Sequence, residues 1–221
     1  MPSRKTIETI LSRLEKMYPI AECSLDNDGD PFHLLVRGIL SAQCTDKRVN
    51  ELTKTLFIKY PGMQDFSVAD VTSLGEEIRS CGLFRAKSKE IIHSSKALIE
   101  RFDGNIPSML QDLESLPGVG RKIANLMLGE LYNVPAIVVD THCARVAKRL
   151  GMTGSDNPAM IEKDLMACIP KDKWITLGHR FVAHGRALCT ARNPACISCE
   201  LREVCIYAKK PGAGKSSEIS D

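Results

Sequence analysis

The chain has 221 residues, of which 43% are hydrophobic and 26% are charged, a balance typical of a folded globular protein. Its longest apolar run covers residues 134–139, far too few to span a bilayer, and no apolar signal region follows Met1. The net charge of +3 does not by itself indicate an anionic partner, so we expect a cytoplasmic globular protein of one or two domains without a membrane partner.

Apolar residues recur at the spacing of amphipathic α-helices through most of the chain. In chain order, these stripes lie within residues 7–17, 32–40, 49–57, 91–102, 123–131, 143–150, 161–169 and 174–188. The helix that contains residues 91–102 should end at Asp103-Gly104, before Pro107. Sustained alternation typical of strands does not occur in the sequence, and residues 137–139 form the one short β-like run. We therefore predict an all-α protein of about ten helices.

The positive charge is concentrated in the second half of the chain. Residues 115–154 carry three more basic than acidic residues, and residues 171–210 carry five more. Such an excess indicates either a solvated face or a surface for an anionic partner.

Nine cysteines occur in the chain, and in a cytoplasmic protein they do not indicate disulfides. Five lie in or near apolar stripes and are interpreted as small buried residues: Cys23, Cys44, Cys81, Cys143 and Cys168. The other four form a C-x6-C-x2-C-x5-C motif: Cys189, Cys196, Cys199 and Cys205. Four thiolates on one short loop can hold a tetrahedral zinc ion or an iron–sulfur cluster. Only one pair has the short spacing usual in zinc sites, so the wider gaps favour an iron–sulfur cluster, with zinc as the alternative.

A Gly-x-Gly turn, Gly118 and Gly120, lies between two helical patterns. Two glycines one residue apart allow a tight hairpin whose backbone N–H groups face outward at the start of the next helix, where a phosphate can bind. Leu116 and Val119 should anchor this hairpin. Alone, the turn would be an ordinary connection between helices, but Lys122 in the first turn of the next helix favours a phosphate-binding site.

Lys122 is a candidate nucleophile. An amine reacts only after losing its proton, although the ordinary lysine pKa is about 10.4. The positive end of the helix dipole and partial burial would both disfavour the ammonium form at this position. The alternative is a solvated lysine on a helix.

Asp140 follows the apolar run at residues 137–139 and precedes Thr141 and His142. This is the position of a helix N-cap, so we predict a capping carboxylate. Because a capping carboxylate has a fixed orientation, the same side chain can also take part in a reaction. We interpret His142 as a structural hydrogen-bonding residue rather than a general base.

Together these motifs resemble those of a known family. Leu-Pro-Gly-Val-Gly-Arg-Lys at residues 116–122, Val-Asp-Thr-His at residues 139–142 and the four-cysteine motif follow one another in the order typical of endonuclease III. Leu-Ser-Ala-Gln-Cys-Thr-Asp at residues 40–46 and Gly-Leu-x-x-x-Lys at residues 82–87 resemble two further segments of that family. From about residue 7 to 209, the chain thus resembles the iron–sulfur branch of the helix-hairpin-helix DNA glycosylases.

The resemblance implies an all-α fold of two lobes. Residues 23–133 would form a six-helix barrel domain with the helix-hairpin-helix. Residues 1–22 and 134–210 would form a discontinuous domain around a [4Fe-4S] cluster held by the four cysteines of the motif. DNA would lie across the cleft between the lobes, and residues 211–221 would be a disordered tail.

The resemblance also implies a partner, namely double-stranded DNA that contains damaged bases or abasic sites. The family flips the damaged base out of the stack. Gln43 would enter the vacated space, and Leu83 would wedge the opposite strand. The other implied DNA contacts are Gly118, Val119, Gly120, Arg121, His142, Arg145 and Arg186.

The implied activity is that of a bifunctional DNA glycosylase and AP lyase of base excision repair. Lys122 would attack C1′ of the sugar, expel the base and leave a Schiff base, after which β-elimination cuts the strand. Asp140 would stabilise the positive charge that develops on the sugar. The substrates would be oxidised pyrimidines such as thymine glycol. The enzyme would be a monomer without a nucleotide cofactor, associated with the nucleoid if its source is prokaryotic.

Two other functions stay open from the sequence. A mismatch- or adenine-directed glycosylase could use the same scaffold, although those branches generally lack a lysine at position 122. A non-catalytic iron–sulfur DNA-binding protein would need neither Lys122 nor Asp140.

Overall fold

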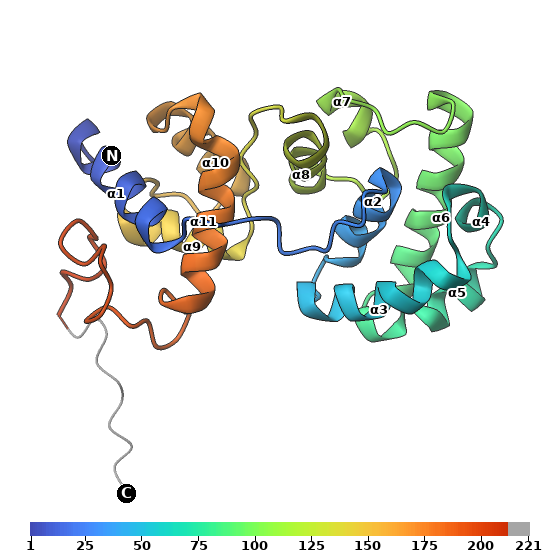
Figure 1. Ribbon diagram of the computed structural model, residues 1–221, viewed down its shortest axis with the longest axis horizontal. Helices are drawn as coiled ribbons and strands as arrows, with labels where there is room; N and C mark the ends of the chain where they lie inside the picture. Colours follow the sequence, from blue (N-terminus) through green and yellow to red (C-terminus); the bar gives the residue numbers. More distant parts are fainter. Residues whose placement is uncertain (212–221) are drawn as a thin grey trace, which may run out of the picture. The chain divides into compact units, whose positions relative to one another are not determined.

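The computed structural model describes residues 1–211, and this part of the chain is helical throughout, without a β-strand (Figure 1). The predicted all-α class is therefore confirmed. The α-helices are α1 (Arg4–Met17), α2 (Pro31–Leu40), α3 (Asp46–Lys59), α4 (Met63–Ser67), α5 (Val71–Glu77), α6 (Phe84–Phe102), α7 (Leu110–Glu114), α8 (Arg121–Tyr132), α9 (Thr141–Leu150), α10 (Pro158–Cys168) and α11 (Trp174–Ala187). Two short 3-10 helices, η1 (Arg79–Cys81) and η2 (Lys171–Lys173), join them.

The contacts divide the chain into two compact units. Among the described residues, one unit comprises Cys23–Val134, and the other combines Met1–Glu22 with residues 135–211. We call them the hairpin unit and the cysteine unit. Apart from Pro211, the segment expected to be a disordered tail lies outside the described residues.

The hairpin unit is built around α2, α6 and α8. Helix α2 begins at Pro31, whose ring suits the first helical position, and the Asp30 carboxylate caps it by accepting from the N–H of Phe32. Helix α6 packs against α4 and α5, and α8 packs against α2 (Figure 1). As predicted, α6 stops before Gly104: its last helical residue is Phe102, and the C-cap Asp103 takes a left-handed conformation with φ 50°.

The cysteine unit has its own apolar core, supplied by segments far apart in the sequence. Helix α9 packs against α11, and α1 and α10 complete the core (Figure 1). Fully buried members of this core include Ile10, Leu14, Val146 and Phe181. The unit therefore depends on the N-terminal helix as well as on the C-terminal half of the chain.

Three helices were missing from the prediction, namely α4, α5 and α7. Each has five to seven residues, too short to repeat an apolar spacing. The short β-like run at residues 137–139 forms no strand and has no regular secondary structure. Among residues 1–211, no helix is long and apolar enough to cross a membrane.

Candidate active site and four-cysteine cavity

The Gly-x-Gly turn forms the predicted hairpin between α7 and α8. Leu116 and Val119 are only 2% and 4% exposed, so both anchor the turn as expected. The N–H of Val119 donates to the carbonyl of Leu116 at 3.1 Å, which closes the turn. Gly118 takes φ +77°, a left-handed conformation that favours glycine. Val119 thus holds the hairpin in place through its buried side chain and its internal hydrogen bond.

Gly118 also permits a close approach to α6. A Cβ atom added at this position would lie 2.7 Å from Cβ of Glu90, closer than non-bonded carbon atoms approach each other in proteins. We expect Gly118→Ala to lower the free energy of unfolding by roughly 1–3 kcal/mol, because it adds this overlap to an unfavourable φ. Denaturant unfolding would measure the loss. Gly120→Ala is the matched control, because Gly120 has φ −91° and nothing lies within 4 Å of its added Cβ; equal losses in both variants would contradict this account.

Lys122 lies in the first turn of α8, directly after the hairpin, as predicted. Gly120 is the N-cap residue and has no side chain to cap the helix. The expected partial burial of Lys122 is wrong, because its side chain is exposed. Cys23 is close by: burial raises the pKa of its thiol to about 11, and the ammonium of Lys122 opposes that rise.

Gln43 and Leu83 belong to the same unit and share an unusual backbone conformation. Both take left-handed conformations, with φ 53° and φ 48°. Gln43 is exposed, and Leu83 is 52% exposed although it is a large apolar residue. Such conformations are costly for residues with a Cβ atom and recur at functional sites.

Asp140 is the N-cap of α9, in the cysteine unit. Its Oδ1 accepts from the backbone N–H of Cys143 at 2.7 Å, so the predicted cap is confirmed. Cys143 is buried, and its thiol pKa is raised by burial first and by the charge of Asp140 second. The half-buried carboxylate is therefore held in one orientation at the start of a helix.

His142 and Arg145 contact each other one turn into α9. Nδ1 of His142 lies 3.0 Å from Nη2 of Arg145. Burial lowers the pKa of His142, the charges of Arg145 and Arg186 lower it further, and Asp140 opposes them. A neutral His142 that accepts from Arg145 agrees with a structural role. Arg145 also donates to the carbonyls of Cys189 and Gly185, both at 2.9 Å, so it ties α9 to the end of α11.

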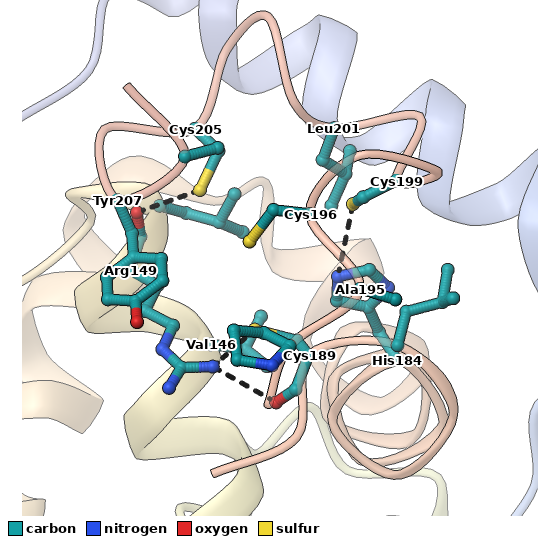
Figure 2. Close-up of a pocket in the computed structure, with 14 residues that line it drawn as sticks. Val146, Arg149, His184, Cys189, Ala195, Cys196, Cys199, Leu201, Cys205 and Tyr207 are labelled. Atoms are coloured by element: carbon teal, nitrogen blue, oxygen red, sulfur yellow. Dashed lines mark hydrogen bonds between the residues drawn. The ribbon is translucent and has the colours of Figure 1, made fainter. Parts of the chain in front are cut away.

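The four cysteines of the C-terminal motif line one cavity in the cysteine unit (Figure 2). The loop that follows α11 surrounds the cavity, and Val146, Arg149 and Leu150 of α9 form part of its wall. The rest of the lining is largely apolar and includes Leu188, Pro194, Ala195, Leu201 and Ala208. Motif residues up to sixteen positions apart are thus brought to a single site.

Polar groups at the rim of the cavity contact the sulfur atoms. Nη1 of Arg149 donates to Sγ of Cys189 at 3.3 Å, and Sγ of Cys205 donates to the carbonyl of Arg149 at 3.2 Å. Nε2 of His184 lies 3.8 Å from Sγ of Cys199 (Figure 2). On the other side of its ring, Nδ1 of His184 lies 3.1 Å from the hydroxyl of Tyr18.

The electrostatics of the cavity disfavour free thiolates. Burial raises the pKa of Cys196 and Cys199, and the neighbouring thiols raise both further. Burial also lowers the pKa of His184 to about 4, so its imidazole is neutral. Thiolates at Cys196 and Cys199 would therefore need a cationic group beside them.

Arg149, His184 and Tyr18 are functional candidates that the sequence did not reveal. Arg145 and Arg149 are four positions apart on one helix and share a face, which is the one local clue to Arg149. The guanidinium of Arg149 lies 4.4 Å from the ring centre of Tyr207. Tyr18 is 166 positions from His184, so no local pattern could have paired them.

The comparisons with known proteins agree with this geometry. Residues 36–171 match the family model of the HhH-GPD superfamily base excision DNA repair proteins. Endonuclease III of Synechocystis sp. is 44% identical over 211 residues, covering 95% of this chain and 96% of the relative. Endonuclease III of Bacillus subtilis is 43% identical, with the same coverage of both chains.

Solved structures extend the comparison to the fold. A trapped covalent intermediate of endonuclease III with DNA matches with a TM-score of 0.91 and 42% identity, covering 95% of this chain and 98% of that one. A thermostable thymine-DNA glycosylase matches with a TM-score of 0.81 at 20% identity, covering 92% and 97%, and shows the shared fold alone. The predicted helix-hairpin-helix glycosylase fold is thus confirmed. The chain belongs to the endonuclease III family of base excision repair enzymes, which are DNA glycosylases and AP lyases.

Proposed function

We propose that this enzyme removes oxidised pyrimidines, with thymine glycol as a typical substrate, from double-stranded DNA and then cuts the strand at the abasic site. The observation that carries the proposal is the exposed Lys122 amine in the first turn of α8, directly after a glycine hairpin, in a member of the endonuclease III family. The match to a covalent complex between endonuclease III and DNA supports a reaction through a covalent intermediate.

The hairpin is the proposed phosphate contact. Gly118, Gly120 and Arg121 lead into the N-terminus of α8, where backbone N–H groups and the helix dipole favour an anion. Such a contact positions the duplex without selecting a base. Arg145 and Arg186 of the cysteine unit, with His142 beside them, would add positive charge and hydrogen bonds for the DNA backbone.

Gln43 and Leu83 are the residues proposed to enter the duplex. Extruding a base leaves a gap in the stack and an unpaired base on the opposite strand. A side chain must fill the gap, and another must pack against the unpaired base. An exposed amide and an exposed leucine in left-handed turns suit these two tasks. The pair would stabilise the extruded state, so that the sugar of the damaged nucleotide becomes accessible to a nucleophile.

Lys122 is the proposed nucleophile. Its neutral amine attacks C1′, the bond from C1′ to the base breaks, and the base leaves with a proton. The sugar ring opens as C1′ and Nζ form an imine. Loss of a proton from C2′ then expels the 3′ phosphate and cuts the strand, and water releases the lysine.

Asp140 is proposed to act as a carboxylate beside the reacting sugar. Departure of the base leaves positive charge on C1′ and the ring oxygen, which a fixed anion stabilises. The hydrogen bond from the N–H of Cys143 holds the carboxylate in one orientation.

We further propose that Cys189, Cys196, Cys199 and Cys205 hold a [4Fe-4S] cluster. The four thiols border one largely apolar cavity, and only one pair of them has the short spacing usual in zinc sites. This donor set fits a cluster that separates its ligands better than it fits one zinc ion. When bound, the cluster would cross-link the loop after α11. Its role would be structural rather than redox, because cleavage of a glycosidic bond transfers no electrons.

Metal analysis tests the cluster. The purified protein should be yellow-brown, with about four iron atoms per chain. Cys199→Ser should lose iron and colour. Cys168→Ser is the control that keeps both, because this half-buried thiol lies outside the cavity. A colourless protein that contains zinc would contradict the proposal.

The cellular setting belongs to the same proposal. We expect a monomer that acts in the cytoplasm, at the nucleoid if the source is prokaryotic. The proposed reaction uses a lysine, a carboxylate and water, and so needs no nucleotide cofactor.

Duplexes with defined lesions test the substrate class. We expect base release and strand cutting together on thymine glycol. We expect neither on uracil opposite guanine nor on adenine opposite oxidised guanine. Scoring the two products separately shows whether lyase activity accompanies base removal. Preference for a mismatch would favour the mismatch-directed alternative, and binding without base release would favour a non-catalytic role.

A further inference from the structure

Lys87 is a buried lysine that the proposed reaction does not use. It lies in the first turns of α6 and is 1% exposed, among the most buried large side chains of the described residues. Lysine is almost never this buried unless its charge is satisfied. Burial lowers the pKa of Lys87, and the neighbouring groups Cys81, Cys44 and Glu90 oppose that change. The burial therefore calls for a specific explanation.

The hydrogen bonds of Lys87 explain why it is buried. Its Nζ donates to the carbonyl of Leu40 at 2.8 Å and to the carbonyl of Cys81 at 2.7 Å. Leu40 is the last residue of α2, and Cys81 is the last residue of η1. Carbonyls at the ends of helices lack partners within the helix and carry partial negative charge. One ammonium thus joins the ends of two elements that are 41 residues apart in the sequence.

These two elements lead directly into the two left-handed residues. Gln43 follows Leu40 by three positions, and Leu83 follows Cys81 by two. The turn after α2 is closed by the N–H of Cys44, which donates to the carbonyl of Ser41 at 3.1 Å. The N–H of Lys87 itself donates to the carbonyl of Leu83 at 3.0 Å. Lys87 therefore contacts the Leu83 turn through its backbone, and its side chain binds the carbonyl that directly precedes each of the two turns.

Left-handed residues with a Cβ atom persist only where the surroundings hold them there. The buried ammonium offers such a constraint, because moving either turn would break a hydrogen bond in an environment without water. We propose that Lys87 is a positioning residue, whose ammonium holds the turn of Gln43 and the turn of Leu83 together so that both side chains enter DNA as one rigid pair. This inference rests on the proposed function, in which these two residues occupy the gap left by the extruded base.

A double-mutant cycle tests the inference. Lys87→Met should lower kcat/KM on a thymine glycol duplex by roughly tenfold to hundredfold, the scale of a small misplacement of contacts made in the transition state. In a background that already carries Gln43→Ala and Leu83→Ala, the same substitution should lower kcat/KM less than about threefold. The effects of coupled residues on kcat/KM are not additive, because Lys87 would act through the two residues that are already missing. Lys89→Met, at an exposed lysine of the same helix, is the matched control and should have no effect in either background.

A binding measurement separates this inference from the substrate assignment. A duplex with a non-cleavable abasic analogue and 2-aminopurine in the opposite strand reports unstacking by fluorescence, without any base removal. The wild type should increase this fluorescence, and Lys87→Met should abolish most of the increase even if thymine glycol is not the substrate. Lys87→Gln keeps an N–H donor and should recover part of it.

Three results would overturn the role of Lys87. One is an equal loss of kcat/KM in both backgrounds. Another is a fluorescence increase in Lys87→Met that matches the wild type. The third is a failure of both Lys87→Met and Lys87→Gln to fold, because the lysine would then support the whole unit rather than two turns.

Discussion

Replacing Lys122 with glutamine should abolish the covalent complex that borohydride traps between the enzyme and thymine glycol DNA. Borohydride reduces an imine to a stable amine, so trapping requires a lysine bonded to C1′. Glutamine has a similar length and stays polar, but it has no amine to form that bond. We expect the trapped complex and strand cutting to fall below detection, a loss of at least about a thousandfold, as seen when a covalent nucleophile is removed.

DNA binding separates chemistry from docking in this experiment. Lys122→Gln should bind a duplex with an abasic analogue nearly as well as the wild type, because Lys122 is exposed and the hairpin before it is closed by its own contacts. Lys89→Gln, an exposed lysine of the same unit, should trap normally. Undiminished trapping by Lys122→Gln would assign the nucleophile to another amine.

Replacing Asp140 with asparagine should lower the rate of base removal by at least about a hundredfold, the scale of one preorganised electrostatic group. Asparagine caps helices about as well as aspartate, so the hydrogen bond to the N–H of Cys143 should survive. The substitution thus removes the charge and keeps the cap. Single-turnover rates on a thymine glycol duplex, measured with thermal unfolding, would show a slow enzyme of normal stability.

A second aspartate cap provides the control for Asp140. Asp70 caps α5, where its Oδ1 accepts from the N–H of Ser73 at 2.9 Å, so Asp70→Asn makes the same chemical change at another helix. It should change neither rate nor stability. Asp140→Ala should add a loss of about 1 kcal/mol in unfolding free energy, because it removes the cap as well. If Asp140→Asn keeps the wild-type rate, Asp140 is a cap and nothing more.

The parts of the site that were predicted correctly depend on short-range interactions. The hairpin at Gly118 and Gly120 follows from residues that touch within a few positions, and so does the cap at Asp140. The exposure of Lys122 was predicted wrongly, because burial depends on what packs over a helix from elsewhere in the chain. The functional roles of these residues came from the resemblance to endonuclease III rather than from their local geometry.

The cysteine cavity, too, was predicted in part from the sequence and in part not. The spacing of the four cysteines predicts that one loop can surround a bulky group, and the structure brings all four to one cavity. The residues at its rim could not be predicted, since Arg149 reaches Cys189 across 40 positions and Tyr18 reaches His184 across 166. Contacts at such separations leave no periodic trace in a single sequence.

The sequence by itself therefore determined the helical class, the long amphipathic helices, the hairpin, the Asp140 cap and the cysteine motif. Each of these follows from periodicity, turn chemistry or ligand spacing within a short stretch of chain. The tertiary structure alone decided which residues surround the cavity, and it alone placed the ammonium of Lys87 between the carbonyls of Leu40 and Cys81. The physical reason is that burial and long-range hydrogen bonds arise only when distant segments pack together, and in Lys87 that packing makes an ordinary helical lysine a link between two turns.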